Sequence, residues 1–355
     1  MPATTSRKFP YPDDLALAVQ SFSFETGQKV LEDDLHIMSW YYDRWRLSMN
    51  AKKTEVSVFH LENRAASHQL DVKLGDELIR HSPTPKYLGV VLDRSLTYRP
   101  HLEQLSQKLK TRNNLIQKIS GTDWGADGNT LRTAALALIY SAAEYCAPAW
   151  YNSSHKGKID VQLNSAMRLV TGTMKSTPTP WLHVLSNIAP PQLRRKSAAH
   201  REWHRSLDDV ALPIRSELIN PPRHRMCSRN PIWLDLEIQN NSFDTNDAWM
   251  RFWDESGDFS NKTLIECPSQ KLEGFDLPRK SWKMVNRFRC GHGGCGHFLR
   301  RWDQRDSPTC DGQTDQTMNH IINGCPIHLF LGGLNELNEL TDAANEWLKN
   351  LDLSV

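Results

Sequence analysis

The sequence has no long apolar run, no recognisable export signal and no strong excess of charge of either sign. No stretch reaches the roughly 18 unbroken apolar residues of a membrane span. The first residues, MPATTSRKFPYPDD, contain no apolar signal-peptide core. We therefore expect an intracellular protein, in the nucleus or cytoplasm, that is neither secreted nor embedded in a membrane. The 355 residues are 39% hydrophobic and 24% charged, which is typical of a folded chain of two or three domains.

Charge is segregated along the chain, although the net charge is only +2. Residues 156–205 contain nine Lys/Arg and two Asp/Glu, and residues 279–305 contain eight and one. Between them, residues 207–277 contain thirteen acids and seven bases. The two basic blocks indicate either nucleic-acid-contacting surfaces or solvated helix faces, and charge alone does not separate these interpretations.

Periodicity predicts an α+β first part and a helical remainder. Residues 15–19 form an apolar run that suits a buried strand, and residues 87–92 predict another strand. Strand-like segments lie on either side of Gly75-Asp76, and this pair predicts a hairpin turn between them. Helical spacing predicts helices in four stretches: 31–45, 102–119, 131–142 and 159–170. It predicts one further amphipathic helix at the C-terminus. Of the twelve tryptophans, the periodic Trp45 and Trp347 are expected in the core, and residues 206–277 are expected to form an irregular connector that buries aromatics.

Two adjacent carboxylates, Asp13 and Asp14, follow Tyr11-Pro12 and directly precede the first apolar run. Paired acids at the entry to a buried strand suit a bound Mg²⁺, which prefers carboxylate and phosphate oxygens. Paired acids are also common in ordinary solvated turns. The pattern by itself leaves both interpretations open.

Further blocks appear in a fixed order after this turn: Trp45-Arg-Leu-Ser-Met-Asn50-Ala-Lys-Lys53-Thr, Lys86-Tyr-Leu-Gly89-Val-Val-Leu-Asp93, Tyr145-Cys-Ala-Pro-Ala-Trp150, Leu163-Asn-Ser-Ala-Met-Arg168, Pro178-Thr-Pro-Trp181, Arg289-Cys-Gly-His292 and Thr317-Met-Asn-His320-Ile-Ile-Asn-Gly-Cys325. In this order the blocks resemble the C-terminal part of a jockey-like non-LTR retrotransposon reverse transcriptase. The resemblance covers most of the chain beyond the first ten residues.

The resemblance implies a role for each matched block. Asp13 matches the palm aspartate that binds catalytic Mg²⁺, with Asp14 beside it, and Lys53 matches a lysine near the phosphates of the incoming nucleotide. Residues 86–93, including Lys86, Tyr87 and Gly89, match the hairpin that grips the primer. The implied partners are an RNA template and a DNA primer or duplex, with basic contacts expected from Lys108, Lys110, Arg168, Arg194, Arg195, Lys196, Arg300 and Arg301.

The resemblance also implies a division of the chain. Residues 1–100 would be a palm remnant, 101–205 a basic helical thumb, 206–277 an acidic connector, 278–330 a Cys/His-rich module and 331–355 a C-terminal helix. Only twelve residues precede Asp13, so we expect the second palm aspartate and the fingers to be missing. A truncated chain would then be inactive alone, unless the missing upstream part of the polymerase acts as a partner. Pro10 and Pro12 lack the N–H that a ladder strand donates, which argues against the upstream half of the metal hairpin.

A second cluster of metal-binding residue types lies near the C-terminus. Cys290, His292, Cys295 and His297 are followed by Cys310, His320 and Cys325. Related elements carry a Cys-Cys-His-Cys set here. Cys310, His320 and Cys325 match three of its members, and the second cysteine is missing. Either Zn²⁺ binds with a fourth ligand from Cys295, Asp311 or water, or the site has decayed and its thiols pack as small apolar groups. If the module folds, Arg287, Arg289, Arg300, Arg301 and Arg305 are expected to form a basic face.

Three hypotheses remain open from the sequence. The chain is a reverse-transcriptase fragment whose family role is RNA-directed DNA polymerisation. Alternatively, it is a nucleic-acid-binding remnant made of the thumb and the Cys/His module. The third hypothesis is a relic that folds poorly because its palm sheet lacks strands.

Overall fold

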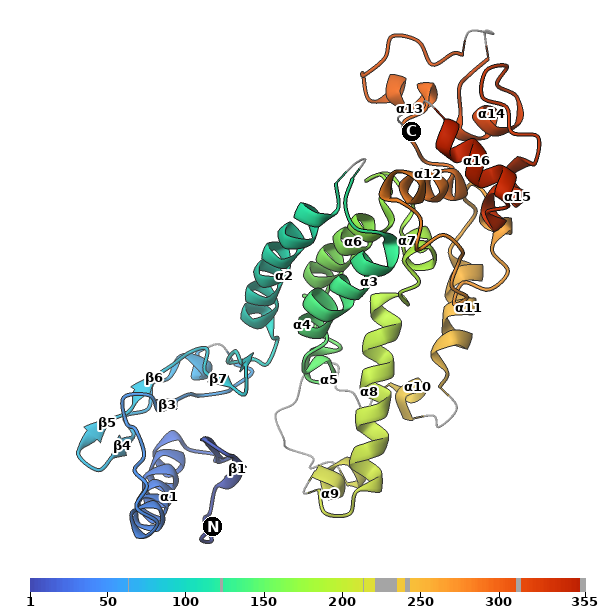
Figure 1. The fold of residues 1–355 in the computed structure, drawn as a ribbon. Helices are drawn as coiled ribbons and strands as arrows, with labels where there is room; N and C mark the ends of the chain where they lie inside the picture. Colours follow the sequence, from blue (N-terminus) through green and yellow to red (C-terminus); the bar gives the residue numbers. More distant parts are fainter. Residues whose placement is uncertain are drawn as a thin grey trace. The chain divides into compact units, whose positions relative to one another are not determined.

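The computed structural model describes residues 1–62, 64–121, 124–212, 214–220, 235–239, 243–310 and 314–351. These form two compact units (Figure 1). Of the described residues, the first unit holds 1–104, 152–156 and 216–220, and the second holds the others. The architecture mixes helices with a few short strands. No helix among the described residues is long and apolar enough to cross a membrane.

The first unit begins with a hairpin that contains the two adjacent aspartates. Strands β1 (Arg7–Tyr11) and β2 (Asp14–Ala18) pair antiparallel, with Tyr11 opposite Asp14 and Pro10 opposite Leu15. Pro10 and Pro12 were expected to argue against the upstream strand of this hairpin, but that strand is formed and paired. The pair that flanks a two-residue turn exchanges hydrogen bonds, so the next pair does not, and Pro10 loses no ladder bond there. β2 is half-buried rather than buried, because β1 is its only strand neighbour among the described residues.

Helix α1 (Phe24–Arg44) follows, with Ser23 as its N-cap. Its apolar stripe packs through Leu31 and Leu35 on a small core of Val56, Leu70, Val72 and Ile79. This confirms the predicted helix, and Met38 is fully buried. Trp45, expected in the core, is 64% exposed, because the helix ends just before it and the chain turns away at Arg46, which has a positive φ.

The other strands of the first unit form short pairs. β3 (Glu55–Val56) lies parallel to β6 (Arg80–His81), and β4 (Lys73–Leu74) pairs with β5 (Glu77–Leu78) across the predicted Gly75-Asp76 turn. A short 3₁₀ turn, η1, covers Ala65–Ser67. Residues 87–92 form a second tight hairpin, β7 (Lys86–Tyr87) and β8 (Val90–Val91), instead of one strand. Leu88 and Gly89 both have positive φ, as the favoured two-residue hairpin turn requires.

The second unit is helical. Helix α2 (Arg99–Ile119) begins in the first unit and buries Leu102, Leu105, Leu109 and Ile116, as its periodicity predicts. The predicted helix over 131–142 is found as α3 (Gly128–Ala135), a π-helical segment η2 (Leu136–Tyr140) and α4 (Ser141–Ala143). Four helices continue the unit: α5 (Ala147–Trp150), α6 (Gly157–Thr171), α7 (Thr179–Ser186) and α8 (Pro191–Asp208).

The described part of the expected connector is more regular than predicted. It contains α9 (Ile214–Ile219), α10 (Leu236–Gln239), the eleven-residue α11 (Thr245–Glu255) and the 3₁₀ turn η4 (Lys262–Leu264). Asp244 caps α11 by accepting hydrogen bonds from two backbone N–H groups. Trp249 and Trp253 are buried, which confirms that this segment buries aromatics.

The C-terminal part contains α12 (Arg279–Cys290), α13 (Gly296–Arg301), α14 (Met318–Asn323), α15 (Gly333–Glu339) and α16 (Asp342–Asn350). The single C-terminal helix of the prediction is thus two helices, separated at Leu340, whose φ is +55°. Together with α12 and α14 they enclose one apolar core that includes Trp282, Phe288 and Leu348. Trp347, expected in the core, is partly buried and packs against its edge.

Helix α12 joins this core to the helical unit by capping α6. Arg279 donates to the carbonyls of Leu169 and Val170, Trp282 donates to Val170, and Asn286 donates to Thr171. These are carbonyls at a helix C-terminus, which have no partner within the helix. The side chains of α12 therefore complete the end of α6.

Candidate nucleic-acid interface and metal centre

The adjacent aspartates lie at an exposed hairpin turn. Asp13 is in the turn and Asp14 opens β2, and both are exposed. The hairpin is anchored from behind by Asp34 of α1, whose carboxylate accepts hydrogen bonds from the backbone N–H groups of Thr5 (3.0 Å) and Ser6 (2.6 Å). Burial disfavours the charge on Asp34, but the hydrogen bonds from Ser6 and Thr5 outweigh it, so its pKa is lowered.

The hairpin at 86–91 lies beside this aspartate hairpin. The Tyr87 hydroxyl donates a 2.7 Å hydrogen bond to the carbonyl of Phe9 in β1. Burial, followed by the nearby charge of Asp14, raises the pKa of Tyr87. Lys86 and Gly89 are exposed at the same hairpin. Two segments about 75 residues apart in sequence, both singled out by their motifs, are thus brought together by the fold.

Lys53 lies in an exposed turn and forms no ion pair with either aspartate. Its backbone N–H donates to the carbonyl of Asn50 at 3.1 Å and lies 3.2 Å from the Asn50 side-chain oxygen. The Asn50 of this motif therefore shapes the turn that carries Lys53.

Asp93, the last residue of the Lys86–Asp93 motif, fixes the loop that precedes α2. Its carboxylate accepts hydrogen bonds from the Thr97 N–H and hydroxyl and from the Tyr98 N–H. These bonds fix a loop in which Leu96 and Tyr98 both have positive φ. Asp93 has this local structural role in addition to its place in the motif.

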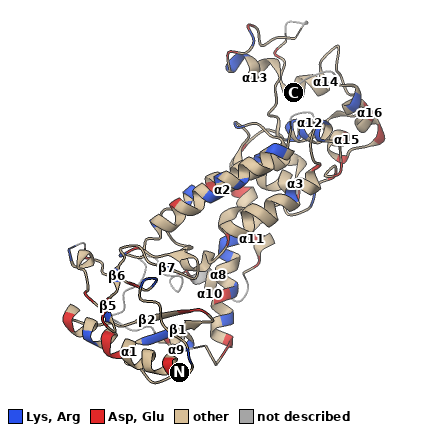
Figure 2. Cartoon of the chain, turned by 60° about the vertical axis from the view of Figure 1, so that its left-hand side comes forward, with Lys and Arg blue, Asp and Glu red and all other residues tan. Residues whose placement is uncertain are grey.

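The basic residues expected to contact nucleic acid fall into two groups. Lys108 and Lys110 are exposed on α2, and Arg300 and Arg301 are exposed on α13 (Figure 2). Figure 2 shows Lys and Arg along α2 and again on α12 and α13. These exposed positions are available to phosphates.

The remaining expected contacts are engaged within the protein. Arg194 forms a bidentate ion pair with Glu144. Burial alone would lower the pKa of Arg194, but the hydrogen bonds and charge of Glu144 outweigh it, so the pKa of Arg194 is raised. Arg195 is 2% exposed, and its guanidinium lies 2.5 and 3.0 Å from the two oxygens of Asp160. Lys196 lies 3.8 Å from Asp235 and over the ring of Phe243. Helix α8 thus turns these three side chains toward acidic neighbours in the protein.

Arg168 is half-buried, and burial lowers its pKa. Its Nη2 donates to the carbonyl of Lys175 at 3.4 Å.

The C-terminal basic face is also smaller than expected. Arg289 is fully buried and donates to the backbone carbonyls of Glu273 and Asn338. In the basic block 279–305, Arg300 and Arg301 are exposed, and neither forms an ion pair with a described residue.

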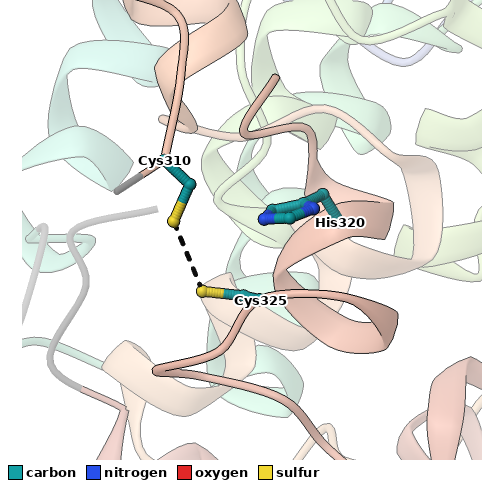
Figure 3. Close-up of side chains that lie close together, drawn as sticks. All are labelled: Cys310, His320 and Cys325. Atoms are coloured by element: carbon teal, nitrogen blue, oxygen red, sulfur yellow. Dashed lines mark hydrogen bonds between the residues drawn. The ribbon is translucent and has the colours of Figure 1, made fainter. Parts of the chain in front are cut away.

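Cys310, His320 and Cys325 converge near the C-terminus (Figure 3). One ligand atom from each lies within 4.8 Å of the other two, and the two sulfur atoms are 3.6 Å apart. Thr317 caps α14 by accepting from the His320 N–H, which fixes the histidine on the first turn of that helix. Among the described residues, this is the one such group of three metal-binding side chains.

This group fits Zn²⁺. Zn–S bonds of about 2.3 Å at tetrahedral angles place two thiolates about 3.8 Å apart, close to the spacing found. The Nε2 atom of His320 is buried and has no hydrogen-bond partner among the described residues, so its lone pair is available to coordinate a metal ion. Asp311, one expected source of a fourth ligand, lies outside the described residues, and Cys295, another, is not part of the group.

The first Cys/His motif has a different structure. Cys290 and Cys295 are buried in two separate apolar clusters, and burial raises the pKa of both thiols, that of Cys290 to about 11. Their histidines instead lie against an aromatic side chain, with His292 and His297 both in ring contact with Phe298. The sequence alone does not reveal these histidine contacts. The signal it does carry is the four-residue spacing of Phe298 and Trp302, which predicts that those two rings meet on one helix face.

No protein-family model and no solved structure matches the chain. Known proteins match it at modest identity. An RNA-directed DNA polymerase from mobile element jockey of Drosophila melanogaster is 29% identical over 167 residues, which are 46% of this chain and 18% of that protein. Its counterpart from Drosophila funebris is 32% identical over 102 residues, which are 29% and 11%. A retrovirus-related Pol polyprotein from type-1 retrotransposable element R1 2 of Nasonia vitripennis is 19% identical over 344 residues, 92% and 80%.

The chain is thus related to RNA-directed DNA polymerases from mobile elements. More narrowly, its relatives are jockey and R1 non-LTR retrotransposon proteins, which confirms the jockey-like reverse-transcriptase resemblance carried by the motifs. The match covers less than a fifth of the length of each of the two jockey polymerases.

Proposed function

We propose that the chain is a fragment of a non-LTR retrotransposon reverse transcriptase whose family role is RNA-directed DNA polymerisation. The observation that carries this proposal is the Tyr87–Phe9 hydrogen bond, which joins the aspartate hairpin to the 86–91 hairpin. In a polymerase, these two segments must act on the same primer end. Their packing therefore supports the roles that the motif order implies.

In this proposal Asp13 and Asp14 hold Mg²⁺, which would activate the primer hydroxyl and stabilise charge on the nucleotide phosphates. Their exposure leaves both carboxylates open to a hydrated metal and a triphosphate. Lys86, Tyr87 and Gly89 contact the primer strand, and Lys53 lies near the nucleotide phosphates. The RNA template and DNA primer follow the exposed lysines Lys108 and Lys110 of α2.

The same chain is proposed to be inactive by itself. Among the described residues, no third Asp, Glu, His or Cys joins Asp13 and Asp14 in a metal-binding group. Two-metal nucleotidyl transfer needs carboxylates that bridge both ions. A separate stretch of polymerase would have to supply the missing ligand, as a partner of this chain.

The second candidate function is nucleic-acid binding without catalysis. It is favoured by the exposed basic residues of α2 and α13 in a unit with its own buried cores. In this proposal Zn²⁺ at Cys310, His320 and Cys325 stabilises the C-terminal module and takes no part in a reaction. Three protein ligands leave one position for water or a further side chain.

Primer extension on an RNA template with Mg²⁺ separates the two functions. The wild-type chain is compared with Asp13→Ala/Asp14→Ala and with a matched control, Asp33→Ala, which removes an exposed acid of α1. We expect no extension by any of the three, together with retained binding in a gel shift. Extension by the wild type and the control that is lost in the double variant would show a working metal site and refute the proposed inactivity. Absence of binding at low salt would refute both functions.

A further inference from the structure

Helix α13 presents a short row of aromatic rings at the surface of the C-terminal module. Phe298 and Trp302 are four residues apart, with ring centroids separated by 5.6 Å and planes inclined by 23°. The imidazole of His292 lies 5.1 Å from Phe298 at 29°. His292, Phe298 and Trp302 thus form nearly parallel rings, and each of the three residues is partly exposed.

This row is not explained by the packing of the core. Phe298 contacts the edge of the C-terminal apolar cluster, but Trp302 lies outside that cluster. His292 donates from Nδ1 to the carbonyl of Cys290 at 2.9 Å, so its ring is held in place and Nε2 carries no proton in the neutral form. Trp302 and His292 thus keep partly exposed ring surface outside the core, which points to a ligand with a flat face.

The row is also rigidly supported. Gln316 accepts from the Gly296 N–H (3.0 Å) and from Arg305 (2.9 Å) through its side chain, and its carbonyl accepts from the His297 N–H. A Cβ on Gly296 would lie 2.7 Å from the carbonyl oxygen of Pro308, so only glycine allows this close approach. The start of α13 is therefore held by Pro308 and Gln316, which flank the paired residues Thr309 and Asp315.

Positive charge lies next to the rings. Arg300 and Arg301 are exposed on the same helix, between Phe298 and Trp302 in sequence, and neither forms an ion pair with a described residue. Aromatic rings beside unpaired arginines are the combination that binds unpaired bases and the phosphates between them. A base-paired duplex offers its phosphates but not its base faces.

We propose that His292, Phe298 and Trp302, with Arg300 and Arg301, form a stacking platform for single-stranded nucleic acid. This inference rests on the proposed nucleic-acid-binding function and assigns it a separate site with its own preference for unpaired strands. The occupant is a single strand of RNA or DNA with one or two bases stacked on the rings. The basic face of α2 has no such rings among its expected contacts and would serve the duplex.

The test is fluorescence anisotropy with a labelled 12-nucleotide dT strand, a U strand of the same length and a 12-base-pair duplex, using the full chain. Trp302→Leu removes a ring and Trp302→Phe keeps one. Trp40→Leu removes a 61% exposed tryptophan from α1 and is the matched control. We expect Trp302→Leu to weaken single-strand binding about tenfold and to leave duplex binding unchanged, because stacking is worth about 1–3 kcal/mol per base. Trp302→Phe should lose about threefold or less, and Trp40→Leu should bind like the wild type.

A second variant, Arg300→Gln/Arg301→Gln, changes only exposed side chains, so we expect its melting temperature to match that of the wild type. It should weaken single-strand binding about tenfold at 50 mM salt and less at 300 mM, whereas Arg251→Gln on the exposed face of α11 should not. Unchanged single-strand affinity in both the Trp302→Leu and the double arginine variants would overturn the platform, as would an equal loss for the duplex. If the wild type binds neither strand nor duplex, the proposed nucleic-acid-binding function fails together with it.

Discussion

The ion pair of Arg195 and Asp160 tests whether a basic residue of α8 stabilises the fold or binds nucleic acid. The side chain of Arg195 is 3% exposed and that of Asp160 is 30% exposed. The guanidinium also lies 5.8 Å from the ring of Trp150. Replacing Asp160 with Asn leaves this buried charge without its counter-ion.

Removing one partner of a fully buried pair costs about 3–5 kcal/mol. Because water reaches Asp160 and can partly solvate the arginine, we expect Asp160→Asn to lower the free energy of unfolding by about 2 kcal/mol. For a unit of this size that is a fall in melting temperature of about 4–8 °C. The substitution raises the net charge by one, so nucleic-acid affinity should not fall.

The assay combines thermal and urea unfolding with a gel shift on the same preparations. Asp208→Asn, an identical change at an exposed position of α8, is the matched control and should melt like the wild type. The double variant Arg195→Met/Asp160→Asn should recover part of the loss, because neither charge is then buried alone. Unchanged melting of Asp160→Asn, together with weaker nucleic-acid binding of Arg195→Met, would refute the structural role of Arg195.

Three further outcomes are expected. Lys108→Gln/Lys110→Gln should leave the melting temperature unchanged and weaken duplex binding, with the slope of log affinity against log salt reduced by about 1.8 if each lysine neutralises one phosphate; an unchanged slope would remove α2 from the interface. Zn²⁺ at about 100 times its dissociation constant should stabilise the wild type by about 2.7 kcal/mol, and Cys325→Ser should abolish that stabilisation; equal stabilisation of both would place the metal elsewhere. Because the pKa of Asp34 is lowered on folding, its contribution to stability is complete above its ordinary pKa of 3.8 and is lost as the pH falls through the folded value. Unfolding of Asp34→Asn measured between pH 2 and 6 should therefore depend less on pH than that of the wild type or of Asp33→Asn, and identical pH profiles would contradict the assignment.

Local sequence patterns predicted the helices well where one apolar stripe meets one core. The stripes of α1, α2 and α6 were read correctly, and so was the Gly75-Asp76 turn. The hairpin at 86–91 appeared as a single strand, because its turn uses Leu88 with positive φ, which no local rule favours for leucine. Pro10 argues against pairing from the sequence alone, because its place in a pair without hydrogen bonds is known only from the register of the folded hairpin.

The candidate sites divide in the same way. The order of motifs identified the relationship to jockey-like polymerases and the three residues Cys310, His320 and Cys325, because residue type and spacing can be read from the sequence without knowing the fold. It did not distinguish exposed from buried arginines. Arg195 and Arg300 look alike in a charge count, yet one lies against Asp160 and the other is exposed on α13.

The sequence by itself determined the periodic helices, the basic and acidic blocks, the paired aspartates and the resemblance to jockey-like polymerases. Only the tertiary structure decided that Tyr87 lies against the aspartate hairpin, that α12 caps α6, and that His292 meets Phe298 rather than a metal. The physical reason is that periodicity and residue type are local, whereas burial, ion pairing and ring stacking depend on partners far along the chain. A charged or aromatic side chain acquires its function from what lies within a few ångströms of it after folding.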